Sequence, residues 1–353
     1  MNTTLNTLSQ GSPVSLSEDV DLMKILSGHI YFQTLYTAVE HDLFSLLYGK
    51  KLTKNEIMQA LGINEKPCRI LLLGLVTINL LHKENDLYAN SKSADTYLCN
   101  QSPNNIKQIV RFEHFIVYKP MYHFYESTKK DTNIGLCEFA GDEDNLYERL
   151  SRTPELIKIF QDAMQEISKL ANTEMTKQID LAGVDYLLDI GGGNGSNIIA
   201  LTERFKEMRA SVFDFPAVCE VATQNLNTQS QKQRLSAIKG NVFVDDLPTG
   251  PDAIMFCHFF TIWSKEKNLL LLQKAYKALP AGGRVIIFNM MQNDAEDGPL
   301  TAAMGSPYFL TLATGEGMLY TWQEYKDLFL QAGFAKIDTQ TLPNDHGLII
   351  GYK

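Results

Sequence analysis

The chain begins with a polar segment and then becomes helical. Residues 1–19 are polar and interrupted by glycine and proline, which predicts a disordered arm. From Val20 onwards apolar residues recur at loosely helical spacing. Thr53 and Glu56 have the spacing of a capping box, and Gly62 follows one short helix later. We therefore expect a small helical domain to start near Val20.

A second helix and a hairpin pattern complete this region. The leucine-rich run at 70–75 predicts a helix, and residues 80–88 form two short strand patterns around an Asn-Asp turn. This order of elements predicts a winged-helix-like domain over residues 20–105. Residues 106–171 are mostly helical in pattern and rich in aromatic residues and histidine. We expect this segment to link two domains and to cover a pocket.

After residue 172 the pattern changes to strand, loop and helix. Buried-strand patterns cover residues 186–190, 210–214, 253–257 and 285–288, and helical patterns cover 197–205 and 268–279. A strand pair is expected at the end of the chain, over residues 335–341 and 347–352. The alternation predicts a mostly parallel sheet covered on both faces. The fold class is therefore α/β, with a Rossmann-like domain over residues 172–353.

A glycine-rich loop follows the first of these strands, in the sequence Asp189-Ile190-Gly191-Gly192-Gly193-Asn194-Gly195. Such a loop opens a helix at the position where doubly wound folds bind nucleotides. A dinucleotide fingerprint needs a third glycine at its sixth position, and Ser196 stands there instead. The spacing of Gly191, Gly193 and Gly195 is typical of S-adenosylmethionine sites, where an amino-acid group replaces the pyrophosphate.

Two further segments support a nucleoside ligand. Asp214 ends the second strand pattern 25 residues after Asp189, in the range where an acidic residue binds ribose hydroxyls. Asn241, Val242 and Phe243 precede the next strand pattern and offer polar and apolar neighbours for an adenine ring. We expect S-adenosylmethionine as the cofactor, with S-adenosylhomocysteine as its product.

Composition narrows the class of protein further. The 353 residues carry a formal net charge of −9, which disfavours nucleic acid and anionic membranes as partners. The five cysteines show no pair at metal-ligand spacing, so no metal is expected, and reduced thiols suit a cytoplasmic protein. No apolar run is long enough to cross a bilayer.

The chain from about residue 20 resembles the plant-type and hydroxyindole-type O-methyltransferases and their bacterial natural-product relatives. Beside the glycine loop, the resemblance rests on the motifs Asp214-Phe215-Pro216, Gly240-Asn241-Val242-Phe243, Trp263-Ser264, Pro280-Ala281-Gly282-Gly283, Gly298-Pro299-Leu300, Thr321-Trp322-Gln323-Glu324-Tyr325 and Ala332-Gly333-Phe334. It implies a class I methyltransferase domain, and a homodimer whose N-terminal domains interlock and help close the partner's pocket. The winged helix is then a dimerisation scaffold.

The resemblance also assigns roles to individual residues. It implies that Gly191 contacts the methionine part, Asp214 and Phe215 the ribose and adenine, and Asn241 to Phe243 the adenine. Asn241 replaces the usual aspartate, and Cys257 stands where plant members have a lysine near the cofactor. The candidate substrate-binding residues are His114, Tyr118, Phe160, Met164 and Met304.

The sequence departs from this family at its catalytic base. The family's histidine lies two residues before Trp263, where this chain has Thr261. The two carboxylates that orient this histidine in the family are also replaced, by Asn289 and Leu319. A threonine hydroxyl is too weak a base to help at neutral pH. The acceptor could be already anionic, could attack through carbon or a neutral amine, or could use another base.

The other candidate bases are His258, His114, His123 and Glu316. Of these, His258 lies nearest Thr261 and is the second candidate catalytic residue. Neighbours on a strand point to opposite faces, so a structural role for His258 is an equal alternative.

These observations predict methyl transfer to a small, aromatic secondary metabolite or its precursor, driven mainly by positioning. Family membership favours oxygen as the acceptor atom, so O-methylation is expected. The missing base makes C- or N-methylation of an aromatic or amino-acid-derived acceptor the alternative. An inactive cofactor-binding regulator is the alternative from another class. A DNA-binding regulator is disfavoured because the second helix of the winged-helix pattern carries only Lys66 and Arg69 as basic residues.

Overall fold

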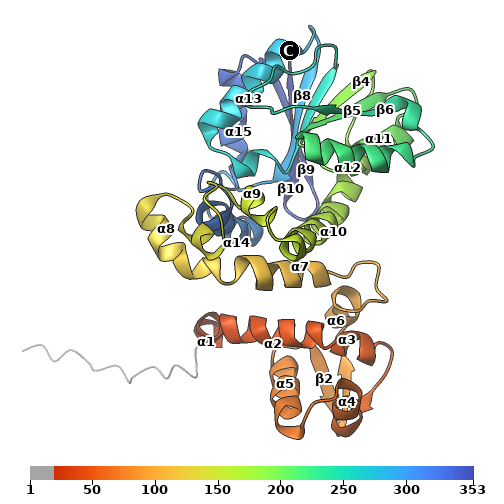
Figure 1. Cartoon of the computed structure of the whole chain (residues 1–353), viewed down its shortest axis with the longest axis vertical. Coiled ribbons are helices and arrows are strands. Elements are labelled where there is room, and N and C mark those ends of the chain that lie inside the picture. The colour runs from red at the N-terminus through yellow and green to blue at the C-terminus, as the bar shows by residue number, and fades with distance from the viewer. Residues whose placement is uncertain (1–19) are drawn as a thin grey trace, which may run out of the picture. The chain divides into compact units, whose positions relative to one another are not determined.

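The computed structural model describes residues 20–353, which form two compact units (Figure 1). The first unit ends at His114 and the second begins at Phe115. This boundary falls inside the segment 106–171 that the sequence suggested as a linker and pocket cover. The arm expected over residues 1–19 lies outside the described residues.

The N-terminal unit consists of short helices around a small sheet. Its helices are α1 (Val20–Leu26), α2 (Gly28–Glu40), α3 (Leu43–Leu47), α4 (Lys54–Leu61), α5 (Glu65–Thr77), α6 (Lys92–Tyr97) and α7 (Lys107–Phe112). Its strands are β1 (Leu52–Thr53), β2 (Leu81–Glu84) and β3 (Leu87–Asn90), in the antiparallel order β1-β3-β2. The predicted order of helix, turn, helix and hairpin is confirmed.

Local sequence signals account for the ends of these elements. The Glu56 amide donates to the Thr53 hydroxyl at 3.3 Å, and the Thr53 amide donates back to the Glu56 carboxylate at 2.7 Å. This capping box starts α4, and Gly62 ends it with a φ of 64°. Cys68 lies fully buried in the core of this unit, with large side chains such as Phe44 and Leu72 around it.

The second unit is built on a seven-stranded sheet. Its strands are β4 (Tyr186–Ile190), β5 (Arg209–Asp214), β6 (Leu235–Lys239), β7 (Ala253–Cys257), β8 (Arg284–Met290), β9 (Lys336–Leu342) and β10 (His346–Tyr352). The strand order is β6-β5-β4-β7-β8-β10-β9. The strand β10 runs in the opposite direction to the other six, so it pairs antiparallel with both β8 and β9. The chain reverses its direction of strand addition between β4 and β7, which is where open α/β sheets bind ligands.

Helices cover both faces of this sheet (Figure 1). They are α10 (Pro154–Gln178), α11 (Ser196–Arg204) and α12 (Pro216–Asn227) on one face, and α13 (Lys265–Ala278) and α15 (Trp322–Gln331) on the other. Successive strand residues alternate between the faces, so Leu187 packs with the first group and Leu188 with the second. The sheet is therefore buried on both sides, as its apolar runs predicted.

The remaining elements of the second unit lie beyond the carboxyl edge of the sheet or connect the strands. They are η2 (Pro120–His123), α8 (Phe124–Lys130), η3 (Ile134–Glu138), α9 (Leu146–Leu150), η4 (Lys232–Arg234), η5 (Phe260–Ile262), α14 (Leu300–Tyr308) and η6 (Phe309–Ala313). The short helix η1 (Glu113–Val117) crosses the boundary between the units. No helix in the described part of the chain is both long enough and apolar enough to span a membrane.

Candidate cofactor and acceptor site

The glycine loop leaves β4 in a conformation that requires glycine. Gly191, Gly193 and Gly195 have φ values of 69°, 57° and 81°, which side chains rarely tolerate. The Phe259 ring also lies so close to Gly191 that a Cβ atom there would be 2.5 Å from it. Above Gly193 there is open space, because no atom lies within 4 Å of a Cβ built there. The loop therefore exposes backbone to an incoming ligand at Gly193.

Asp189 lies beneath this loop as a buried carboxyl group. Its side chain is fully buried, and neither oxygen has a hydrogen-bond partner within normal distance. Burial raises the pKa of Asp189 to about 8, with the nearby Asn197 amide lowering the pKa and Asp214 raising it. A cationic ligand would stabilise the ionised form of this group.

Asp214 reaches the loop from the end of β5. Its carboxylate accepts hydrogen bonds from the Gly193 amide at 3.1 Å and from the Phe215 amide at 2.7 Å. Burial raises the pKa of Asp214, and these two hydrogen bonds lower it. The side chain remains half-buried, so its oxygens can still accept bonds from a ligand.

Apolar and polar groups for a flat ring lie beside these acids. The Asn241 side chain stabilises the turn in which it lies, because its oxygen accepts a hydrogen bond from the Phe243 amide at 3.0 Å. The Phe243 ring meets Trp263 edge to face, with 4.7 Å between the ring centroids. Val242 is buried, whereas Phe215 is 53% exposed. Phe215 is therefore available to contact a planar group.

Taken together, these residues fit S-adenosylmethionine. The unpartnered Asp189 carboxyl suits the cofactor's ammonium or sulfonium charge, Asp214 suits ribose hydroxyls, and Phe215 suits adenine. Cys257 lies at the end of β7. Burial is the larger cause that raises the pKa of its thiol, and the nearby Asp189 charge raises it further. It therefore adjoins the glycine loop, but as a neutral thiol.

Thr261, the residue expected from the resemblance to replace a histidine base, lies on η5 and is 4% exposed. The surrounding backbone holds η5 tightly. The Thr314 hydroxyl donates a hydrogen bond to the Ile262 carbonyl, and Gly317 packs directly against the Thr261 carbonyl. At the two positions where the resemblance led us to expect carboxylates, the Asn289 amide donates to the Tyr325 hydroxyl at 3.1 Å and Leu319 is fully buried.

His258 lies in a position that argues against the role of general base suggested by the sequence. Its backbone has a φ of 52°, and its ring packs against Phe288 and His346 at centroid distances of 4.9 and 5.1 Å. Burial, followed by the nearby His346, lowers the pKa of His258 to about 3. A base suited to catalysis near neutral pH has a pKa near 7.

The other candidate bases are also engaged. His114 belongs to the N-terminal unit, where it stacks on Tyr36 with 3.4 Å between ring centroids. Glu316 is exposed and pairs with Lys267 at 2.6 Å. His123 bonds to Glu138 at 2.8 Å.

The candidate acceptor residues of α10 lie on one stripe. Phe160, Met164 and Ser168 are spaced four residues apart, and Asn172 continues the series. The Asn172 amide donates to Asn197 of α11, which adjoins Asp189. The stripe therefore starts beside the glycine loop and leads away from it.

Aromatic rings lie at the far end of this stripe. The Phe160 ring meets Tyr147 of α9 edge to face at 5.8 Å. Met304 on α14 is 70% exposed, and Tyr118 is half-buried just after η1. The described residues therefore provide an aromatic wall at Phe160, and the contribution of Met304 and Tyr118 to an acceptor site stays a prediction.

Several groups could not be found from the sequence. Phe259 and the Asn172–Asn197 pair gain their place only through the fold.

Replacing Asp189 with asparagine should make the cofactor-free protein more stable, increasingly so as the pH rises from 5 to 8. The folded pKa of about 8 lies above the unfolded value near 3.9, so the folded state retains a proton that the unfolded state has lost. Wild-type stability therefore falls across this window, by up to about 1.4 kcal/mol per pH unit relative to the variant. Thermal unfolding of both proteins from pH 5 to 8 measures the difference. If the difference in stability between the two proteins did not change with pH, the raised pKa of Asp189 would be contradicted.

Comparison with known proteins identifies the family. A model of the O-methyltransferase domain matches residues 133–335, and a model of the O-methyltransferase dimerisation domain matches residues 23–100. The chain belongs to the S-adenosylmethionine-dependent O-methyltransferase family, and its second unit has the class I methyltransferase fold. It is a methyltransferase of the type that acts on secondary metabolites.

Individual relatives extend over the whole chain. The chain is 36% identical to L-tyrosine C(3)-methyltransferase of Streptomyces lavendulae, covering 100% of this chain and 98% of the relative. It matches the apo structure of the S-adenosylmethionine-dependent methyltransferase SibL with a TM-score of 0.83 at 32% identity, covering 95% and 99% of the two chains. Human N-acetylserotonin methyltransferase, solved with the cofactor, gives a TM-score of 0.83 at 22% identity, covering 98% and 99%. This last match shows the shared fold.

Proposed function

We propose that this enzyme methylates a ring carbon of a phenolic amino acid or a close derivative of one. The observation that carries the proposal is the buried Thr261 in place of the family's histidine base. The sequence favoured oxygen on family grounds. We favour carbon because His258, with a pKa of about 3, does not replace the missing base.

The two acceptor atoms make different demands on the protein. A phenol has a pKa near 10, so methylation of its oxygen at neutral pH needs a base. A ring carbon beside the hydroxyl is already electron-rich. After it gains a methyl group, the ring is cationic and loses the proton on that carbon to water as aromaticity returns. Positioning can then supply most of the rate enhancement.

The proposed roles of this chain's residues follow from their positions. Bound S-adenosylmethionine supplies an electrophilic methyl group on a sulfonium. Asp189 and the glycine loop hold the amino-acid end, Asp214 the ribose, and Phe215 with Asn241, Val242 and Phe243 the adenine. Met164 and Phe160 orient the acceptor ring. His258 supports this arrangement as a neutral, half-buried side chain.

The acceptor class is supported by the similarity over the full length of the chain. A relative at 36% identity is named for methylation of L-tyrosine at C3. The aromatic wall at Phe160 and Tyr147 suits a ring of this size. We therefore take tyrosine as the first acceptor to be tested.

The test is to incubate the purified enzyme with methyl-labelled S-adenosylmethionine and L-tyrosine, and to locate the methyl group by NMR. We expect a ring-carbon methyl group and an unmodified hydroxyl. O-Methyltyrosine as the product would overturn the proposal. If tyrosine is not turned over, the same assay with hydroxylated and O-methylated tyrosine derivatives decides whether ring-carbon transfer occurs, and exclusive oxygen transfer again overturns it.

Thr261→Val should change the rate of ring-carbon methylation by less than about threefold. A residue acting as general base contributes about 10²- to 10⁴-fold, so a loss of that size would show that the hydroxyl takes part in proton transfer. Thr261→His is the matched comparison. It should leave ring-carbon methylation no faster, while any O-methylation of a phenol gains from it.

We also propose that the protein forms a homodimer through its N-terminal unit, which matches the dimerisation domain. Large apolar side chains are exposed on this unit. Ile25, Ile70 and Leu73 are 77%, 63% and 67% exposed, and a second copy of the chain would cover them. Ile70 and Leu73 are neighbours on α5, three residues apart, and monomeric proteins rarely leave contiguous apolar patches in contact with water.

A double substitution, Ile70→Glu with Leu73→Glu, should convert the dimer to a monomer. Both residues lie on the exposed side of α5, and burying carboxylates at an interface is costly. Size-exclusion chromatography with light scattering measures the change. Leu330→Glu, on an exposed leucine of α15 in the other unit, is the control and should remain dimeric. A dimeric double variant would show that α5 lies outside the interface.

A further inference from the structure

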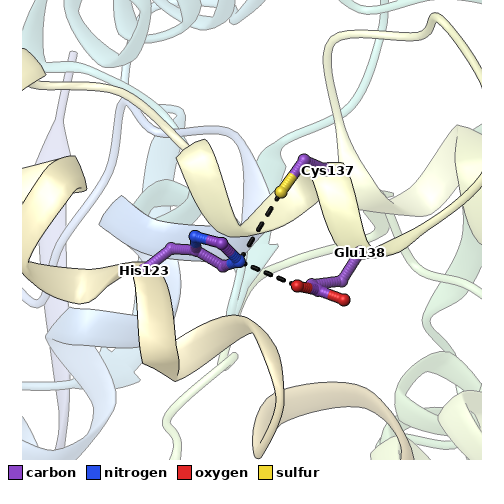
Figure 2. Close-up of side chains that lie close together, drawn as sticks. All are labelled: His123, Cys137 and Glu138. Atoms are coloured by element: carbon purple, nitrogen blue, oxygen red, sulfur yellow. Dashed lines mark hydrogen bonds and ion pairs between the residues drawn. The ribbon is translucent and has the colours of Figure 1, made fainter.

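Three metal-ligand side chains converge at a place outside the proposed cofactor site. His123 ends η2, and Cys137 and Glu138 end η3, so one turn of each short helix contributes (Figure 2). The His123 Nε2 atom lies 2.8 Å from Glu138 Oε1 and 3.6 Å from Cys137 Sγ. One ligand atom from each residue lies within 4.8 Å of the other two.

The arrangement differs from a catalytic triad in one decisive detail. In a triad, the nucleophile and the carboxylate bond to different nitrogens of the histidine ring. Here the Cys137 sulfur and the Glu138 oxygen both approach the same nitrogen, Nε2 of His123 (Figure 2). The Nε2, Sγ and Oε1 atoms therefore form one compact group of possible metal ligands.

The spacing of the ligand atoms also fits a metal ion. Zinc lies about 2.0 Å from a histidine nitrogen and about 2.3 Å from a cysteine sulfur, so a tetrahedral site separates these atoms by about 3.5 Å. The observed separation is 3.6 Å. Nitrogen and carboxylate oxygen are expected about 3.3 Å apart. They are 2.8 Å apart here, so Glu138 must move outward by about half an ångström, which its position near the surface permits.

Charge and donor type favour a divalent ion of intermediate softness. Thiolate and carboxylate together carry two negative charges, and sulfur, imidazole and carboxylate are the zinc donors in proteins. The second oxygen of Glu138 pairs with Lys119 at 2.5 Å, which leaves the first oxygen to bind as a single ligand. The Lys119 side chain is 76% exposed and can turn towards water when a cation enters.

We propose that His123, Cys137 and Glu138 bind a zinc ion, with water as the fourth ligand. No metal site could be predicted from the sequence, because the cysteines are widely spaced and the ligands come from two separate turns. The ion links η2 to η3 across the intervening α8, and both short helices pack against η6. Its effect is therefore to stiffen the segment 120–138 in the second unit.

The experiment is a cobalt titration of full-length protein that carries no affinity tag and has been treated with a chelator. Cobalt bound to a thiolate gives a charge-transfer absorption in the near ultraviolet. We expect this band to saturate at one equivalent and to disappear when zinc is added. Cys137→Ser should abolish the band, and His123→Gln should weaken binding by more than about tenfold, a loss that even outer-shell partners of a metal cause.

Two exposed residues provide matched controls. His82→Gln in β2 and Glu126→Gln in α8 change the same residue types away from the cluster and should leave the titration unchanged. Zinc should also protect Cys137, the one cysteine classed as exposed in residues 20–353, from alkylation by iodoacetamide. This measurement needs no variant and is independent of methyl transfer.

Thermal unfolding gives a third readout. Zinc at a hundredfold excess over its Kd should raise the Tm of the wild type by about 5 to 10 °C and leave that of Cys137→Ser nearly unchanged. No thiolate band in the wild type, a band that persists in Cys137→Ser, or alkylation of Cys137 at the same rate with zinc would each overturn the proposal.

Discussion

Replacing Asp214 with alanine should weaken S-adenosylmethionine binding by about 100-fold. A hydrogen bond to a charged group contributes about 1.5 to 3 kcal/mol, and the proposed contact includes both ribose hydroxyls. The cost of desolvating Asp214, visible in its raised pKa, offsets part of this gain. A net loss near 2.7 kcal/mol is therefore expected, which corresponds to about 100-fold in Kd.

Calorimetric titration with S-adenosylmethionine and with its demethylated product measures this loss. Because Asp214 also accepts the Gly193 amide, the variant could lose affinity by disturbing the glycine loop. Adenosine and 2′,3′-dideoxyadenosine separate the two causes. The wild type should prefer adenosine, and the variant should lose that preference. Asp246→Ala, on a side chain that is 92% exposed, should bind like the wild type. An Asp214→Ala variant that still discriminates would refute the ribose contact.

Replacing Gly317 with alanine should destabilise the second unit by about 3 kcal/mol or more. A Cβ atom at this position would be 2.0 Å from the Thr261 carbonyl oxygen and 2.6 Å from the Ile262 carbonyl carbon. Both atoms belong to backbone, so a change of side-chain rotamer cannot relieve the overlap. Either η5 or the loop 314–318 must move. The Tm should fall by about 6 to 12 °C, and methyl transfer should slow because Thr261 lies on η5.

Gly28 provides the control for this substitution. It begins α2, and no atom lies within 4 Å of a Cβ built there, so Gly28→Ala should have little effect on stability. Differential scanning calorimetry of both variants gives the comparison. If Gly317→Ala unfolded within 2 °C of the wild type, the close packing of this loop on η5 would be wrong.

Most of the sheet could be predicted from the sequence because its central strands are buried on both faces. The patterns at 186–190 and 253–257 coincide with β4 and β7, since a continuous apolar run of strand length marks such a strand. The edge strand β6 was not predicted. Its sequence Leu235–Lys239 is only partly buried and includes Ser236 and Lys239, so the apolar signal is weak.

The site divides in the same way. The glycine loop is local in sequence, so its spacing alone indicated S-adenosylmethionine as the cofactor. The S-adenosylmethionine dependence of the family agrees with this prediction. The low pKa of His258 could not be predicted from the local sequence, because it comes from contact with Phe288 and His346 on other strands. The proximity of His123, Cys137 and Glu138 was not local either, because it depends on two turns that come together across α8.

The burial of Asn289 and Leu319 limits how a catalytic base could be introduced into this enzyme. Restoring the family's catalytic histidine at Thr261 would not restore its carboxylate partners, because Asn289 is committed to the Tyr325 hydroxyl and Leu319 to apolar packing. Introducing either carboxylate alone would place a charge in the core without a counterion, at a cost of several kcal/mol. Either carboxylate introduced first therefore lowers the stability of the protein, and Thr261→His introduced first has no carboxylate to orient its ring. A complete base assembly requires coordinated changes at Thr261, Asn289 and Leu319.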